Sequence, residues 1–231
     1  MASKSQWGTG AGPLDLDSSA RLFFTDHEWR TIDAATARIM PTDHDPGARE
    51  AGVVFFIDRY LSGIDYIYAT ADGSGFLRLE GREAEAYSVR IQELREVYRS
   101  GISELDALAQ EREGAPFADL SEERQDYVLE LLSHAPKPET VVLGEFDPVA
   151  SFLQGFGDDG LAFFDLLVLH TRQGMYSDPA YGGNRDRVGW KLIGFPGPES
   201  LAATNDCSYS LRHLHVSDYS WEDLVPHLRG E

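Results

Sequence analysis

The sequence predicts an all-α protein, an irregular helical bundle with a long, loop-rich C-terminal third. Apolar residues recur at spacings of three and four in several long segments, as they do on the buried face of a helix. Helix-capping residues precede those segments, which marks where the helices begin. No convincing run of paired strands is present, and glycine and proline interrupt the chain from Gly174 onward.

The first helix is expected to follow Thr25. Thr25 and Glu28 have the spacing of a capping box, in which two residues satisfy each other's unpaired backbone amides. Pro41 ends this helix, because proline cannot continue it. Its buried stripe is predicted to consist of Trp29, Ile32, Ala35 and Ile39.

A second helix is expected from about Ala48 to Leu61. Its centre, VVFFI at positions 53–57, is apolar on every side, which places it in the middle of the bundle. The β-branched residues also fit a strand, but charged residues at both ends favour a helix. The following residues, Ile64 to Leu79, are compatible with helix or strand, with a turn at Asp72 to Gly75.

The longest helix is expected from about Arg82 to Arg112. Its apolar residues keep helical spacing: Tyr87, Ile91, Leu94, Tyr98, Ile102, Leu105 and Leu108. Gly101 lies within this stretch, where glycine costs about 1 kcal/mol relative to alanine. It is therefore expected to mark a close helix crossing or a kink.

The next helix is expected to be capped by Ser121, with Glu122 and Glu123 stabilising its positive end. Its predicted buried face consists of Tyr127, Val128, Leu131 and Leu132. His134 follows this helix, where it can interact with the last carbonyl groups.

An apolar helix through Leu169 is expected to be capped by Asp158 or Asp159. His170 is then expected to lie at its C-terminal carbonyls. A short final helix is predicted near residues 221–224. The predicted organisation is a flexible lead-in at 1–20, a helical domain at 21–198 and a C-terminal extension at 199–231 that packs on it.

Composition excludes several functions. The formal charge of the chain is −19, and no two Lys or Arg residues are adjacent, so nucleic acid and anionic lipid surfaces are poor partners. The single cysteine, Cys207, permits neither an internal disulfide nor a cysteine metal cluster. No apolar run approaches the ~20 residues that cross a bilayer. The N-terminus shows no export signal, so a cytoplasmic location is expected, or a periplasmic one if the N-terminus was processed or is incomplete.

The stretch from Gly174 to Pro198 is the most informative part of the chain. It holds six glycines and three prolines, yet it keeps four aromatic residues: Tyr176, Tyr181, Trp190 and Phe195. A loop that carries large apolar side chains is expected to pack against something. Two interpretations remain open, a lid folded onto this chain's own bundle and a docking surface for another protein.

Three segments carry a resemblance to a known family: Arg38 to Asp58, Phe117 to Leu120 with the helix after it, and Met175 to Gly197. On these residues the chain resembles the gluconate 2-dehydrogenase subunit 3 family. The resemblance implies a non-catalytic small subunit that helps a larger subunit mature, stay soluble or be exported. The larger subunit would be of the glucose-methanol-choline oxidoreductase type and would hold the FAD, with no cofactor in this chain. A cytochrome or another electron acceptor is a further candidate partner.

The resemblance also selects the candidate partner-interface residues, all within the last motif: Tyr176, Asp178, Pro179, Tyr181, Gly182, Gly183, Asn184 and Trp190. Asp178 and Asn184 are expected to hold the turn through side-chain to backbone hydrogen bonds. Trp190 is expected to be either a buried part of the lid or an anchor of the interface.

The alternative hypotheses are a stand-alone metal-dependent enzyme and a binding module for a different protein. Asp43, His44 and Asp45 offer metal ligands, although adjacent side chains rarely converge on one ion. His213 and His215 would share one face of a strand, but no third ligand accompanies them at a recognisable spacing. The sequence contains no GxSxG motif. The turn at Gly182, Gly183 and Asn184 lacks the GxGxxG pattern of a dinucleotide-binding loop and is not expected to follow a strand into a helix. We therefore predict no catalytic residue, bound cofactor or metal ligand in this chain.

Overall fold

The computed structural model describes residues 20–64, 66–69, 76–134, 158, 160–195 and 197. The chain divides into two compact units. A helical unit comprises Leu16–Ile64 and Glu80–Phe195, and a second unit comprises Met1–Asp15, Asp65–Leu79 and Pro196–Glu231. Apart from Ala20, the predicted lead-in and the predicted extension lie outside the described residues. The predicted domain boundaries therefore stay a prediction.

The fold class is all-α, as predicted. The described part of the second unit adds a small antiparallel hairpin, formed by β1 (Tyr66–Ala69) and β2 (Phe76–Arg78). Tyr66 pairs with Arg78, and Ala69 pairs with Phe76. The segment that was compatible with helix or strand is therefore a pair of strands.

Helix α1 (Asp26–Ile39) begins with the predicted capping box. The backbone amide of Glu28 donates to the Thr25 hydroxyl, and the amide of Thr25 donates to the Glu28 carboxylate at 2.8 Å. The helix ends before Pro41, as expected. Ile32 and Ala35 of the predicted stripe are fully buried.

Helix α2 (Val53–Ser62) begins five residues later than the sequence suggested. Residues 48–52 form turns instead, in which the amide of Ala51 donates to the carbonyl of Gly47 and that of Gly52 to the carbonyl of Arg49. Val53, Val54 and Ile57 of the apolar centre are buried as predicted. Phe55 and Phe56 are only partly buried, although both pack against the core.

Helix α3 (Gly81–Glu113) agrees with its prediction to within one residue at each end. Gly101 marks a close crossing, because a Cβ atom there would overlap the ring and Cβ of Phe163. A 3₁₀ turn, η1 (Phe117–Asp119), then leads to helix α4 (Glu122–Ser133). Ser121 occupies the N-cap position as expected, but its side chain forms no capping hydrogen bond.

The predicted buried face of α4 was partly wrong. Tyr127 is 44% exposed, whereas Leu129 is buried beside Val128. Gln125 is also buried and donates from its amide to the carbonyl of Phe117 at 3.1 Å. Residues 125, 128, 129 and 132 share one helical face, and that face points at the bundle, so Tyr127 falls outside it.

Helix α6 (Phe163–Tyr176) is followed by two 3₁₀ turns, η2 (Pro179–Tyr181) and η3 (Arg185–Arg187), and by the short helix α7 (Val188–Leu192). The thinning of regular structure after α6 is confirmed within the described residues. The short helix predicted near 221–224 lies outside them.

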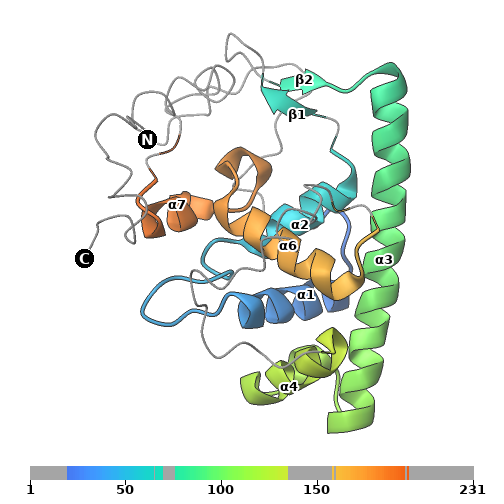
Figure 1. Ribbon diagram of the computed structural model, residues 1–231, viewed down its shortest axis with the longest axis vertical. Coiled ribbons are helices and arrows are strands. Elements are labelled where there is room, and N and C mark those ends of the chain that lie inside the picture. Colours follow the sequence, from blue (N-terminus) through green and yellow to red (C-terminus); the bar gives the residue numbers. More distant parts are fainter. Residues whose placement is uncertain are drawn as a thin grey trace, which may run out of the picture. The chain divides into compact units, whose positions relative to one another are not determined.

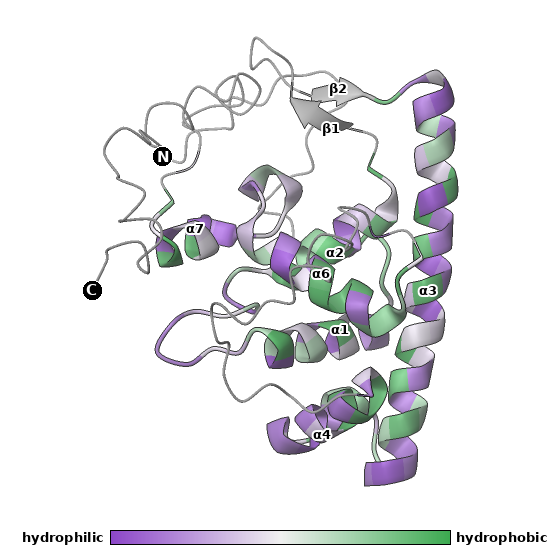
Figure 2. Ribbon diagram, viewed as in Figure 1, coloured by the Kyte–Doolittle hydropathy of each residue, from purple (hydrophilic) through white to green (hydrophobic). Residues whose placement is uncertain are grey.

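Within the helical unit, α3 runs along one side while α1, α2 and α6 pack on one another and against it (Figure 1). The most hydrophobic helices are α2 and α6, and they lie side by side (Figure 2). Helix α7 lies near the C-terminal end of α6, away from α3 (Figure 1). Within the described ranges, every helix is too short or too polar to cross a lipid bilayer.

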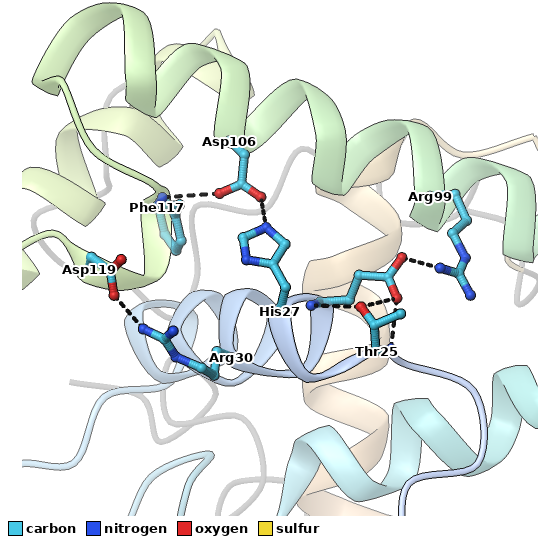
Figure 3. Close-up of polar contacts among 8 residues, drawn as sticks. Thr25, His27, Arg30, Arg99, Asp106, Phe117 and Asp119 are labelled. Atoms are coloured by element: carbon cyan, nitrogen blue, oxygen red, sulfur yellow. Dashed lines mark hydrogen bonds and ion pairs between the residues drawn. The ribbon is translucent and has the colours of Figure 1, made fainter.

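Polar contacts fasten the start of α1 to α3 and η1 (Figure 3). The imidazole Nε2 of His27 lies 2.6 Å from a carboxylate oxygen of Asp106, whose other oxygen accepts from the amide of Phe117 at 3.0 Å. Two ion pairs join the same elements, Arg99 with Glu28 and Arg30 with Asp119. Three segments far apart in the sequence are thereby held together.

Candidate functional site

The candidate interface motif, residues 174–195, is organised around Asn184. This side chain is fully buried, and its backbone φ of 45° lies in the left-handed region. Its amide nitrogen Nδ2 donates to the carbonyl of Ser177 at 2.8 Å, and its oxygen Oδ1 accepts from the amide of Gly189 at 2.9 Å. Its backbone amide donates to the carbonyl of Gly174 at 2.7 Å. One residue therefore ties the end of α6 to the start of α7.

The glycines of this segment permit a close approach of backbone to backbone. A Cβ atom on Gly183 would overlap the carbonyl of Gly174, and one on Gly189 would overlap the carbonyl of Met175. Only glycine fits at these two positions without movement of the chain. The glycine-rich composition thus has a packing reason.

Trp190 is buried within the segment and is bonded to the end of α6. It is only 5% exposed, and its indole Nε1 donates to the carbonyl of Tyr176 at 2.7 Å. Phe195 packs edge-on against it, with the ring centroids 5.2 Å apart. The interpretation of this stretch as an intramolecular lid therefore holds for Trp190.

Residues 174–195, which we call the lid, also contact α2 and the turns before it. The backbone amide of Arg185 donates to the carbonyl of Ala51 at 3.0 Å, and its guanidinium lies 3.4 Å from the ring centroid of Phe55. Asp178 accepts from the amide of Ala180 at 2.9 Å and so caps η2. The predicted hydrogen-bonding roles of Asp178 and Asn184 are confirmed.

The remaining candidate residues lie around this framework. Tyr176, Pro179 and Tyr181 are half-buried, whereas Gly182 and Gly183 are buried. The outer edge of the segment is different, because Asp186, Arg187, Lys191, Leu192 and Ile193 are all exposed. Contact of the segment with a partner stays a prediction.

A buried polar cluster lies inside the helical unit, between α2, α3 and α6. His170 is fully buried in the middle of α6, and its Nδ1 lies 2.9 Å from the hydroxyl of Tyr98 on α3. Its Nε2 lies 3.3 Å from a carboxylate oxygen of Asp158. Asp158 also accepts from the hydroxyl of Tyr60 at 2.9 Å and pairs with Arg90.

This cluster corrects two predictions. His170 does not lie at a helix C-terminus, because α6 continues for another turn and a half to Tyr176. Asp158 is not the cap of α6, because Ala162 occupies that position. Both residues instead supply hydrogen-bonding groups to the core, where buried polar atoms need partners. Asp159 lies outside the described residues.

Burial sets the protonation of the cluster. It lowers the pKa of His170 to about 3, with the charge of Arg90 as a second cause, so the imidazole is neutral at neutral pH. Burial also raises the pKa of Tyr98 well above its ordinary value, with Tyr60 as a second cause. A neutral imidazole has one N–H, so it can accept from Tyr98 while donating to Asp158. Tyr98, Asp158 and His170 therefore satisfy one another inside the core, whereas the side chain of Arg90 at the edge of the cluster is 37% exposed.

The candidate metal ligands Asp43, His44 and Asp45 do converge, contrary to the expectation that adjacent side chains point apart. Their ligand atoms lie within 4.8 Å of one another. However, the His44 side chain is 85% exposed and its two ring nitrogens face different carboxylates, at 3.3 and 3.2 Å. Asp43 also accepts from the amide of Asp45 at 2.8 Å, which is ordinary turn chemistry. His213 and His215 lie outside the described residues.

Sequence reasoning missed Asp58, which is 1% exposed on α2. Its carboxylate accepts from the backbone amides of Leu22, Phe23 and Phe24 at 2.7 to 3.0 Å. The sequence signal for this role was the position of Asp58, an acidic residue directly after the apolar stretch at 53–57. It anchors the segment before α1 to the core.

Comparison with models of known protein families shows to which family this chain belongs. The family model described as gluconate 2-dehydrogenase subunit 3 matches residues 26–197. The chain belongs to this family. The match runs from the first residue of α1 to just beyond the lid, so it covers nearly all of the described helical unit. Searches of curated proteins and of solved structures gave no significant match.

Membership in the gluconate 2-dehydrogenase subunit 3 family supports an accessory subunit of a dehydrogenase complex. An accessory role also agrees with the geometry of the candidate site. The polar groups with the most perturbed pKa values, His170 and Tyr98, are enclosed by helices, and the lid motif is held by its own backbone. The conspicuous motif of this chain thus shapes a surface, and its polar core stabilises the bundle behind it.

Proposed function

We propose that this chain is the non-catalytic small subunit of a flavin-dependent sugar or polyol dehydrogenase. The partner would be a larger oxidoreductase of the glucose-methanol-choline type that binds FAD and oxidises the substrate. This chain would bind the partner and assist its maturation or stability. A cytochrome or another electron acceptor would complete the electron path.

The observation that carries this proposal is the family match over residues 26–197. It includes both the helices that form the core and the lid, so the feature held in common with the family is the described helical unit. The structure supports a binding role in a second way. Asn184 and Trp190 fix a short helix, α7, on the surface by buried hydrogen bonds, as expected of a preformed recognition element.

Co-expression tests the proposal. An affinity-tagged form of the chain is produced together with an untagged candidate flavin oxidoreductase of the glucose-methanol-choline type. We expect the two proteins to co-purify in fixed proportion, with flavin absorbance in the same fraction. A matched culture without this chain should yield less soluble or less active flavoprotein.

Two results would contradict the proposal. One is a soluble and fully active flavoprotein made without this chain. The other is substrate turnover by the purified chain alone with no flavin present. Turnover that depends on added metal would favour the alternative hypothesis based on Asp43, His44 and Asp45.

A further inference from the structure

The outer edge of the lid has an unusual charge for this protein. Positions 185–193 contain three basic residues and one acidic residue, although the whole chain has 20 basic and 39 acidic residues. Arg187 and Lys191 are both exposed, and among the described residues neither forms an ion pair with a carboxylate. By contrast, the arginines of α1 and α3 are widely paired: Arg30 with Asp119, Arg38 with Asp126, Arg90 with Asp158 and Arg99 with Glu28.

The same edge exposes two consecutive large apolar side chains. Leu192 is 39% exposed and Ile193 is 58% exposed. The other large apolar residues exposed in the described ranges, Leu22, Val89 and Tyr127, lie singly on other elements. Single exposed apolar residues are ordinary on a protein surface, whereas a group bordered by charge is typical of an interaction site.

The residues that lead into α7 have a strained backbone conformation. Asp186 and Arg187 have positive φ angles of 54° and 57°, next to Asn184 at 45°. Non-glycine residues in this region cost about 1–3 kcal/mol each and persist only when their surroundings enforce them. The buried hydrogen bonds of Asn184 and Trp190 supply that enforcement. A preformed edge loses little conformational entropy on binding.

We propose that the α7 edge, defined as Arg187, Lys191, Leu192 and Ile193, is the surface that docks the flavin dehydrogenase subunit. The partner's matching surface is an apolar pocket bordered by carboxylates. Arg187 and Lys191, which form no ion pair with a carboxylate among the described residues, fit such a border, and the two aliphatic side chains fit the pocket. Charge complementarity of this kind orients an encounter and speeds it. This inference rests on the proposed function and adds the part of the chain that makes the contact.

Affinity measurements on surface variants test the α7 edge. The tagged chain is immobilised and the purified flavoprotein is titrated over it. Ile193→Asp and Lys191→Glu should each weaken binding at least about tenfold, as expected for a central contact and for a reversed charge. Val89→Asp on α3 is the matched control, because Val89 is 61% exposed, and it should change affinity less than about twofold.

Two further measurements distinguish an effect on binding from an effect on folding, and test the contribution of charge. Because the substituted side chains are exposed, the melting temperatures of both variants should equal that of the unmodified chain. The association rate of the unmodified chain should fall as salt is raised, and more steeply than that of Lys191→Gln.

The outcomes distinguish the two proposals. If the unmodified chain binds the flavoprotein and the α7-edge variants bind equally well, the docking surface is wrong and the proposed function stands. Loss of binding in Val89→Asp alone would likewise contradict the proposed docking surface. If the unmodified chain captures no flavin dehydrogenase, both proposals fail together.

Discussion

Asn184 shows how one side chain can organise a loop. It is fully buried and joins Ser177, Gly189 and Gly174 through two side-chain bonds and one backbone bond. No other common side chain combines an amide donor, an amide acceptor and tolerance of a positive φ at this length. The conformation of the lid therefore depends on this residue as well as on its aromatic rings.

Replacement of Asn184 tests that dependence. Asn184→Ala leaves the amide of Gly189 and the carbonyl of Ser177 without these partners, so the free energy of unfolding should fall by about 2–4 kcal/mol. Asn184→Asp keeps the acceptor but places a buried carboxylate oxygen against the carbonyl of Ser177, so it should cost at least as much as Asn184→Ala. Urea unfolding measures both values, and a loss below about 1 kcal/mol for the alanine variant would contradict this account.

Trp190 acts through both burial and a hydrogen bond. Trp190→Ala should lower the free energy of unfolding by about 3–5 kcal/mol, because it empties a buried site. Trp190→Phe retains most of the apolar surface but loses the bond to the carbonyl of Tyr176, so it should be the milder change. Thermal and urea unfolding of the isolated chain measure this. An unchanged melting temperature for Trp190→Ala would show that the lid is not closed in solution.

His170 links stability to pH. Its pKa is lowered to about 3 in the folded chain, whereas an unfolded histidine titrates near 6.5. Between these values the unfolded chain binds a proton that the folded chain does not, so this residue's contribution is intact above about pH 6.5 and is lost as pH falls toward 3. The expected slope is up to about 1.4 kcal/mol per pH unit.

Acid unfolding of a matched variant isolates this contribution. His170→Gln cannot titrate, so its stability relative to the wild type should improve as pH is lowered from 7 to 4. Urea unfolding at each pH gives the comparison. A constant difference between the two proteins across that range would mean that the His170 proton is not linked to folding.

At the scale of elements, long amphipathic helices were the most predictable part of the chain. Both ends of α3 were predicted to within one residue, because seven apolar residues at helical spacing leave little choice of secondary structure. The start of α2 was wrong because the turns at 48–52 depend on contacts with the carbonyl of Met40 and with Arg185. Such contacts join distant or non-helical residues, and no local pattern encodes them.

Gly101 permits a close crossing of helices α3 and α6. Alanine is the better helix former, by about 1 kcal/mol. Gly101→Ala should nevertheless destabilise the protein by about 1–3 kcal/mol, because the added methyl group overlaps Phe163 on α6.

Ser100→Ala on the exposed side of the same helix is the control, and it should be neutral or slightly stabilising. Thermal unfolding of the two variants gives the comparison. Stabilisation by Gly101→Ala would show that α3 and α6 lie further apart than described.

For the whole molecule, the formal charge of −19 opposes compactness through self-repulsion. Added salt shortens the Debye length from about 30 Å at 0.01 M to about 8 Å at 0.15 M. The melting temperature should therefore rise over this range, by about 2–4 °C for each 1 kcal/mol of repulsion relieved. Scanning calorimetry in increasing sodium chloride measures this, and a falling melting temperature would mean that attractive ion pairs dominate.

The sequence alone determined the helical class, the family relationship and the motif that carries it. These properties depend on residues close in the chain: capping pairs, apolar periodicity and the glycine-aromatic run at 174–198. The tertiary structure alone decided the cluster of Tyr98, Asp158 and His170, the burial of Asp58 and the outward face of α7. Each of these depends on segments tens of residues apart meeting in space, and which of them meet is set by how the helices pack.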